Sequence, residues 1–81
     1  MNVRVRLFAV ARELAGCDWV SLEVPEGSTV AQLRARLAAE FPALAAVLPQ
    51  VLFAVGSEYV PNDAVLAAGS EVACIPPVSG G

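Results

Sequence analysis

One segment of the chain has the periodicity of a long helix, and short strand-like segments stand on both sides of it. Its apolar residues recur at the spacing of one face of an amphipathic helix: Val30, Leu33, Leu37 and Phe41. Thr29 and Gln32 match a capping-box pattern at its start, and Pro42 ends it. Because one helix cannot cover both faces of a sheet, we expect this helix to pack across a single face.

Alternating apolar and polar residues predict the strands, since successive side chains of a strand point to opposite faces. The expected strands span residues 3–8, 19–24, 51–55, 58–60 and 71–75. Between the first two, residues 10–16 are interpreted as a loop or one helical turn that Gly16 ends. Residues 44–48 form an apolar linker with a possible short helical turn, and Leu66 is expected to fill the core from a loop.

The order of these elements is strand, strand, helix, strand, strand, strand. It favours an α+β fold in which the first and last strands pair at the centre of a mixed sheet. This is the β-grasp, or ubiquitin-like, roll, with about five strands and one main helix on one face. We expect residues 1–75 to form this single domain and residues 76–81 to form a flexible tail that ends in two glycines.

Two apolar residues fall on the polar side of their strands. Phe8 shares a face with Arg4 and Arg6, and Ile75 shares a face with Glu71. Exposed apolar side chains on adjacent central strands predict a partner docking surface, with Tyr59 as a weaker third member. The alternative is a register read one residue out of place, which would bury both Phe8 and Ile75.

The chain ends Pro76-Pro77-Val78-Ser79-Gly80-Gly81. The prolines donate no backbone hydrogen bond and favour an extended path, and the glycines make a tip thin enough to thread a narrow channel. The ordinary alternative is a frayed end or an artificial remnant. As a chemical group, the terminal carboxylate is a poor acyl donor until a partner enzyme with ATP converts it to an acyl-adenylate, from which a thiol or persulfide displaces AMP.

The residue inventory offers no self-contained active site. Histidine is absent, so the commonest general base is missing and no serine has an obvious activator. Cys17 and Cys74 lie far apart without metal-ligand spacing, and we interpret both as small buried or half-buried apolar residues. No metal site is expected, and no nucleotide-binding glycine motif is present.

Charge and hydropathy argue against two classes of partner, nucleic acids and membranes. The net charge is −3, and the five basic residues are all well-separated arginines without a basic stripe, which argues against nucleic acid. No stretch of about 18 apolar residues predicts a membrane span. The first residues alternate charge with apolar side chains, unlike a signal peptide, and a cytoplasmic location is expected.

At this point the motifs resemble a known family, the small subunits of molybdopterin synthase, which are ubiquitin-like sulfur carriers. The resemblance spans the whole chain, and the tail is its most specific part. Its motifs are Leu7-Phe8-Ala9, Arg12-Glu13-Leu14-Ala15-Gly16, Pro25-Glu26-Gly27-Ser28-Thr29-Val30, Glu58-Tyr59-Val60, Glu71-Val72-Ala73 and residues 75–81.

The resemblance implies that an E1-like enzyme adenylates Gly81 and that a sulfurtransferase step leaves a thiocarboxylate there. The tail, Pro76 to Gly80, would then enter the active site of the large synthase subunit. Sulfur would pass to precursor Z to build the molybdopterin dithiolene, within a heterotetramer of two small and two large subunits. The small chain is thus not an enzyme on its own. It binds no cofactor, the activating enzyme uses the ATP, and the catalytic lysines belong to the large subunit.

The resemblance also implies that Phe8, Tyr59 and Ile75 dock on the partner. The chain departs from the family at Gly56, where asparagine is common, at Cys74, where a larger apolar residue is usual, and in having no lysine. Other functions stay open: a sulfur carrier for thiamine, tRNA thiolation, cysteine or tungsten cofactor synthesis, a ubiquitin-like protein modifier, or a plain interaction module. The cognate activating enzyme, the sulfur donor and the oligomeric state are also open.

Overall fold

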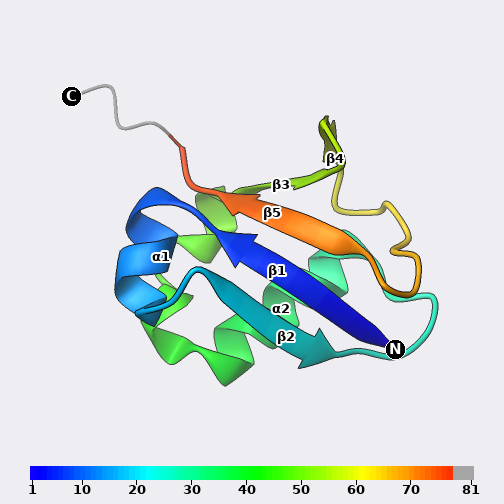
Figure 1. Ribbon diagram of the computed structural model, residues 1–81, viewed down its shortest axis with the longest axis horizontal. Helices are drawn as coiled ribbons and strands as arrows, with labels where there is room; N and C mark the ends of the chain where they lie inside the picture. The colour runs from blue at the N-terminus through cyan, green and yellow to red at the C-terminus, as the bar shows by residue number, and fades with distance from the viewer. Residues whose placement is uncertain (78–81) are drawn as a thin grey trace.

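A computed structural model describes residues 1–77 and shows a five-stranded mixed sheet with its helices packed behind one face (Figure 1). The strands are β1 (Asn2–Leu7), β2 (Trp19–Glu23), β3 (Leu52–Val55), β4 (Glu58–Val60) and β5 (Glu71–Ile75). The helices are α1 (Ala9–Ala15) and α2 (Val30–Glu40), and two 3₁₀ turns follow α2 at Pro42–Leu44 and Leu48–Gln50.

The strand order is β2-β1-β5-β3-β4, with the first and last strands of the chain side by side at the centre. β1 and β5 run parallel, with Val5 opposite Val72, whereas the other neighbours are antiparallel. This arrangement confirms the β-grasp prediction, including the central pairing of the two terminal strands. It also places the carboxyl end of β5 in the middle of one end of the sheet.

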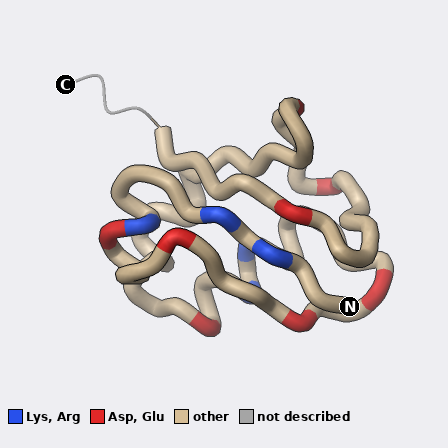
Figure 2. Tube along the Cα trace, in the orientation of Figure 1, with Lys and Arg blue, Asp and Glu red and all other residues tan. Residues whose placement is uncertain are grey.

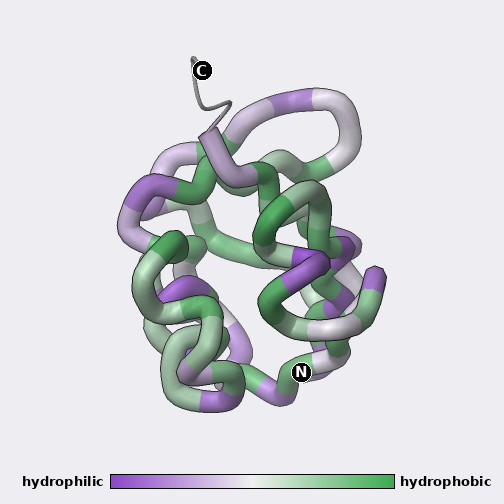
Figure 3. The backbone as a smooth tube through the Cα atoms, turned by 90° about the vertical axis from the view of Figure 1, so that its left-hand side faces the viewer, coloured by the Kyte–Doolittle hydropathy of each residue, from purple (hydrophilic) through white to green (hydrophobic). Residues whose placement is uncertain are grey.

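The core lies between the sheet and α2. The buried residues of β1, β2 and β5 face this side, as does Phe53 of β3, and α2 contributes the expected apolar stripe. The largest fully buried side chains are Phe53, Leu7, Leu33, Leu37, Leu44 and Leu48. Leu66 is buried too, as expected for a core residue supplied by a loop. Figure 3 shows hydrophobic and hydrophilic segments interspersed along the described part of the backbone.

The N-terminus of α2 confirms the capping box. The Thr29 hydroxyl oxygen accepts a hydrogen bond from the backbone N–H of Gln32, and the Gln32 carboxamide oxygen accepts one from the backbone N–H of Thr29, at 2.8 Å. These bonds satisfy two amides that have no partner inside the helix. The helix ends before Pro42, with Phe41 as its C-cap.

The segment after β1 corrects the sequence interpretation. Instead of a loop or one turn, it is the seven-residue helix α1, which Gly16 ends in the left-handed conformation, φ 75°. Alanine, arginine, glutamate and leucine favour helix, and burial of Ala11 anchors it to the core. Phe8 is therefore the N-cap of α1 rather than a strand residue. Ala9 follows it with φ 51°, a backbone conformation that costs a non-glycine residue roughly 1–2 kcal/mol.

Arg34 lies outside the apolar stripe of α2, and its side chain is nevertheless half-buried. Its guanidinium donates to the backbone carbonyl oxygens of Leu48 and Val51 and, at 2.9 Å, to the side-chain oxygen of Asn62. It also lies over the Phe53 ring, 4.8 Å from the centroid. One side chain of α2 therefore holds the turn before β3 and the loop after β4 in place.

Candidate docking surface

The face of the sheet opposite α2 carries the residues that the sequence analysis singled out. Residues paired directly across neighbouring strands share a face. The register therefore defines a cross-sheet row, with one residue from each strand in spatial order: Trp19, Arg6, Ala73, Ala54 and Tyr59. No helix in residues 1–77 covers this open face, which looks toward the viewer in Figure 1.

Phe8 and Ile75 lie together at the end of the sheet where β5 finishes. Leu7 pairs with Cys74, and the backbone N–H of Phe8 donates to the Cys74 carbonyl oxygen at 3.2 Å, so Phe8 comes beside Ile75. On the other side, Ile75 pairs with Leu52 on β3. We call Phe8, Ile75 and Leu52 the apolar row.

The apolar row is open to solvent in part. Phe8 and Ile75 are half-buried, and Leu52 is 52% exposed. Neither Phe8 nor Ile75 belongs to the buried core, so the alternative register that would bury both is wrong. Such a strip of partly exposed apolar side chains suits contact with another protein.

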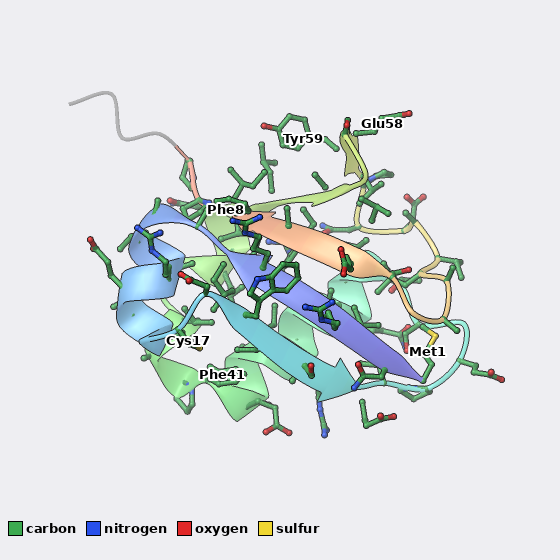
Figure 4. All side chains as sticks on the ribbon, viewed as in Figure 1. Met1, Phe8, Cys17, Phe41, Glu58 and Tyr59 are labelled. Carbon is green, nitrogen blue, oxygen red and sulfur yellow. The ribbon has the colours of Figure 1, made fainter. Side chains whose placement is uncertain are left out.

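Tyr59 shares the open face but stands apart from the apolar row. It lies on the edge strand β4 opposite Ala54, is 65% exposed, and projects beyond the sheet (Figure 4). Strand β3 separates it from Ile75. The structure therefore brings Phe8 and Ile75 together and leaves Tyr59 at the rim of the same face.

A hollow of about 270 Å³ lies on the open face beside the apolar row. Small residues from β3, the following turn and β5 contribute to its lining, and larger side chains from β1, β2 and β5 surround them. The lining consists of Arg6, Phe8, Trp19, Ala54, Gly56, Glu71, Val72 and Ala73. Ala54 is only 8% exposed although it faces this side.

Arginine and aromatic side chains stack along one side of the hollow. The Arg6 guanidinium carbon lies 5.1 Å from the centroid of the Phe8 ring and 5.6 Å from that of Trp19. The Arg4 guanidinium lies 4.4 Å from the Trp19 ring and also pairs with the Glu71 carboxylate at 2.6 Å. Rings so close to a guanidinium attract it through their quadrupoles and limit its motion.

Trp19 and Leu52 belong to this surface, and the sequence analysis missed both. Trp19 has the same phase as the outward Ser21 and Glu23, so the rule that identified Phe8 could have found it. Leu52 opens β3 with the phase of Ala54, one residue later than the start of the expected strand. Phase was the available signal in each case.

The structure describes only the first two residues of the expected tail. Pro76 is buried and Pro77 is exposed, so Pro76 packs with the domain. The rest of the expected tail lies outside the described residues: Val78, Ser79 and Gly80 of the predicted threading segment, and Gly81 as the predicted site of the thiocarboxylate. The end of β5 nonetheless places the start of the tail directly beside the apolar row.

The two cysteines are free thiols in different settings. Cys17 is exposed, which corrects its interpretation as a buried or half-buried residue. It lies just after the Gly16 cap, where the chain leaves α1 for β2. Cys74 is buried, and burial raises the pKa of its thiol from 9.0 to about 11, partly offset by the nearby Arg34 charge. Residues 1–77 hold no cluster of three metal-ligating side chains and no helix of the length and apolarity that crossing a membrane requires.

Comparison with known proteins places this surface in context. The ThiS family profile matches residues 5–81, which include the second half of β1, all of the other strands and the tail. The chain belongs to the ThiS family. Two members are similar over its whole length: the molybdopterin synthase sulfur carrier subunits of Chlamydomonas reinhardtii, 42% identical with all of that chain covered, and of Arabidopsis thaliana, 40% identical with 84% covered.

Solved structures share the fold of this ThiS-family chain. The small archaeal modifier protein SAMP1 of Haloferax volcanii superposes with a TM-score of 0.87 at 30% identity, with both chains fully covered. A chain in the complex of subunits 1 and 2 of the molybdopterin-converting factor from Helicobacter pylori superposes with a TM-score of 0.70, again with both chains fully covered. At 23% identity, the second likeness shows the fold alone.

Proposed function

We propose that this chain is the sulfur carrier subunit of a molybdopterin synthase. The observation that carries the proposal is its 40–42% identity, over its full length, to two sulfur carrier subunits of that enzyme. The apolar row at the base of the tail adds support, because a carrier needs a docking surface beside the group that it delivers.

The carried group is formed on the carboxylate of Gly81. An E1-like enzyme transfers AMP from ATP to this carboxylate and releases pyrophosphate. The persulfide of a sulfurtransferase then displaces AMP to give an acyl disulfide, and a thiol reduces it to the Gly81 thiocarboxylate and a mixed disulfide. ATP thus serves the activating enzyme, and the carrier itself holds no cofactor.

Delivery requires the large subunit of the synthase. The apolar row and Tyr59 dock on that subunit, and residues 77–81 reach its active site, where the thiocarboxylate gives its sulfur to precursor Z. The catalytic side chains are those of the large subunit. Two sulfur atoms per dithiolene fit an assembly of two small and two large subunits, which we place in the cytoplasm.

The test is an intact-mass measurement after incubation with the activating enzyme, ATP and a sulfur donor. We expect a mass gain equal to the exchange of one oxygen for sulfur, followed by its loss when the large subunit and precursor Z are added. A variant with one residue appended after Gly81 is the matched control and should gain nothing. An unchanged mass with an activating enzyme that is active on a reference carrier would overturn the proposal.

A protein modifier is the second candidate, because the similarity to the small archaeal modifier protein is high in both fold and coverage. In that case the activated Gly81 would pass to amines of other proteins. Mass spectrometry of the same reaction in a cell extract separates the two functions. Isopeptide adducts ending in Gly81 would support the modifier, and a free thiocarboxylate that precursor Z consumes would support the carrier.

A further inference from the structure

Two arginines stand two residues apart on β1, and their electrostatic situations differ. Arg4 pairs with Glu71 across the β1–β5 boundary. Arg6 pairs with no carboxylate in residues 1–77. A guanidinium offers five N–H donors in a planar fork that matches a carboxylate. Arg6 therefore presents unused donors at the middle of the open face.

The aromatic neighbours hold Arg6 ready for a ligand. Its guanidinium lies near two aromatic rings, those of Phe8 and Trp19. A side chain that is already confined loses less conformational freedom on binding than a free one. Arg6 is nevertheless exposed, so an anion of a partner can reach its charge.

The hollow beside Arg6 sets the shape of the ligand. Ala54 and Ala73 line it with short apolar side chains, and its volume of about 270 Å³ leaves room for a large apolar side chain. Glu71, the acidic residue of the lining, is already paired with Arg4. A ligand that fits both features carries an apolar group next to a negative charge.

The charge distribution supports a negative partner at this place. The chain is acidic overall, with a net charge of −3. Figure 2 shows basic positions on β1 at the middle of the sheet, with an acidic position of β5 close beside them and other acidic positions toward the ends and edges. The hollow is continuous with the apolar row through Phe8, which lines both.

We propose that Arg6 and the hollow form a receptor for one segment of a partner protein, in which an aspartate or glutamate adjoins a large apolar side chain. The carboxylate accepts hydrogen bonds from the Arg6 fork, and the apolar side chain fills the space over Ala54 and Ala73. The proposal rests on the proposed function, since the partner is the large subunit. It adds an electrostatic anchor to a docking surface that is otherwise apolar.

The test measures the affinity of the full chain for the cognate large subunit by isothermal titration calorimetry at low and high salt. Arg6→Gln should weaken binding about tenfold and reduce its salt dependence, and Arg6→Glu should weaken it further because two carboxylates then face each other. Arg6→Lys should recover part of the loss, since a lysine keeps the charge but lacks the fork. Ala73→Phe should weaken binding with Arg6 intact, because it fills the hollow.

Arg36→Gln is the matched control. Arg36 is an exposed arginine on α2, at the opposite face, and pairs with Glu40. Its replacement should leave the affinity for the large subunit within about twofold of that of the original chain, because exposed ion pairs contribute little to stability. Circular dichroism of every variant establishes that the domain remains folded.

The outcomes separate the two proposals. If the unaltered chain does not bind the large subunit, the proposed function is wrong. If it binds and the Arg6 variants bind equally well, the function stands and the receptor is wrong. If Arg6→Gln instead converts a self-associated form of this chain to a monomer, a second copy occupies the hollow, and the receptor for the large subunit is again wrong.

Discussion

The backbone N–H of Phe8 donates a hydrogen bond to the carbonyl oxygen of Cys74, with 3.2 Å between the two atoms. This bond continues the β1–β5 pairing one residue beyond the end of β1. It holds the start of α1 against the end of β5, just before the tail begins. The position of the apolar row relative to the first residue of the tail is therefore set by the backbone.

The first prediction concerns Ile75. Replacing it with glutamate places a charge in the middle of the apolar row, and we expect binding to the large subunit to weaken at least about tenfold. Val65→Glu is the control, because Val65 is 67% exposed and lies outside the row. Both variants should unfold near the temperature of the original chain. Equal binding by the two variants would show that the apolar row is not the docking surface.

The second prediction concerns Arg34. Its replacement by alanine removes the donor for the Leu48 and Val51 carbonyl oxygens and should lower the free energy of unfolding by about 2–3 kcal/mol. Arg36→Ala, on the same helix, removes only an exposed ion pair with Glu40 and should cost about 0.3–0.5 kcal/mol. Urea denaturation measures both. Similar losses would contradict a structural role specific to Arg34.

The third prediction concerns the helix cap. Thr29→Ala removes the hydroxyl acceptor at the start of α2 and should destabilise the domain by about 1 kcal/mol, which lowers Tm by roughly 4–8 °C. Thr29→Ser keeps a hydroxyl at the same place and should keep most of the stability. Thermal unfolding followed by circular dichroism compares them. A serine variant as unstable as the alanine variant would argue against the cap.

The fourth prediction concerns pH. Burial raises the pKa of the Cys74 thiol from 9.0 to about 11, so the unfolded chain loses this proton before the folded chain does. The preference of the fold for the neutral thiol is complete below pH 9 and disappears as the pH rises toward about 11. We therefore expect the free energy of unfolding to fall across this window. Cys74→Ala should show a shallower fall in parallel urea titrations, and an identical slope would contradict the assignment.

Much of this fold could be predicted because its strands have one solvent-exposed face and one buried face. In β5, the alternation of Glu71, Val72, Ala73, Cys74 and Ile75 fixed which side chains enter the core, and the structure confirms it. The capping residues fixed the start of α2 in the same way. Patterns of this kind express local rules, which a sequence carries without knowledge of distant contacts.

Features that depend on distant contacts could not be predicted in this way. The hydrogen-bond acceptors of Arg34 lie 14–28 residues farther along the chain. The sequence of α2 carries no pattern that indicates them. In α1, Ala11 is the one buried residue and Ala15 packs half-buried against the core, while Val10 and Leu14 are exposed, so its seven residues show no clear helical period. The β1–β5 register places Arg4 opposite Glu71 and Arg6 opposite Ala73, so only Arg4 forms an ion pair with Glu71. Only the assembled sheet defines this register.

The central position of β5 has a consequence for the synthesis of this protein. A ribosome releases β1 first and β5 last, so the middle of the sheet stays incomplete until almost the whole chain has been made. Pairings between residues so distant in sequence form late in folding. A product that stops before Glu71 lacks the strand on which β1 and β3 both depend, and proteases remove unfolded chains. Completion of the sheet thus selects for molecules that extend at least through Ile75, to the base of the tail.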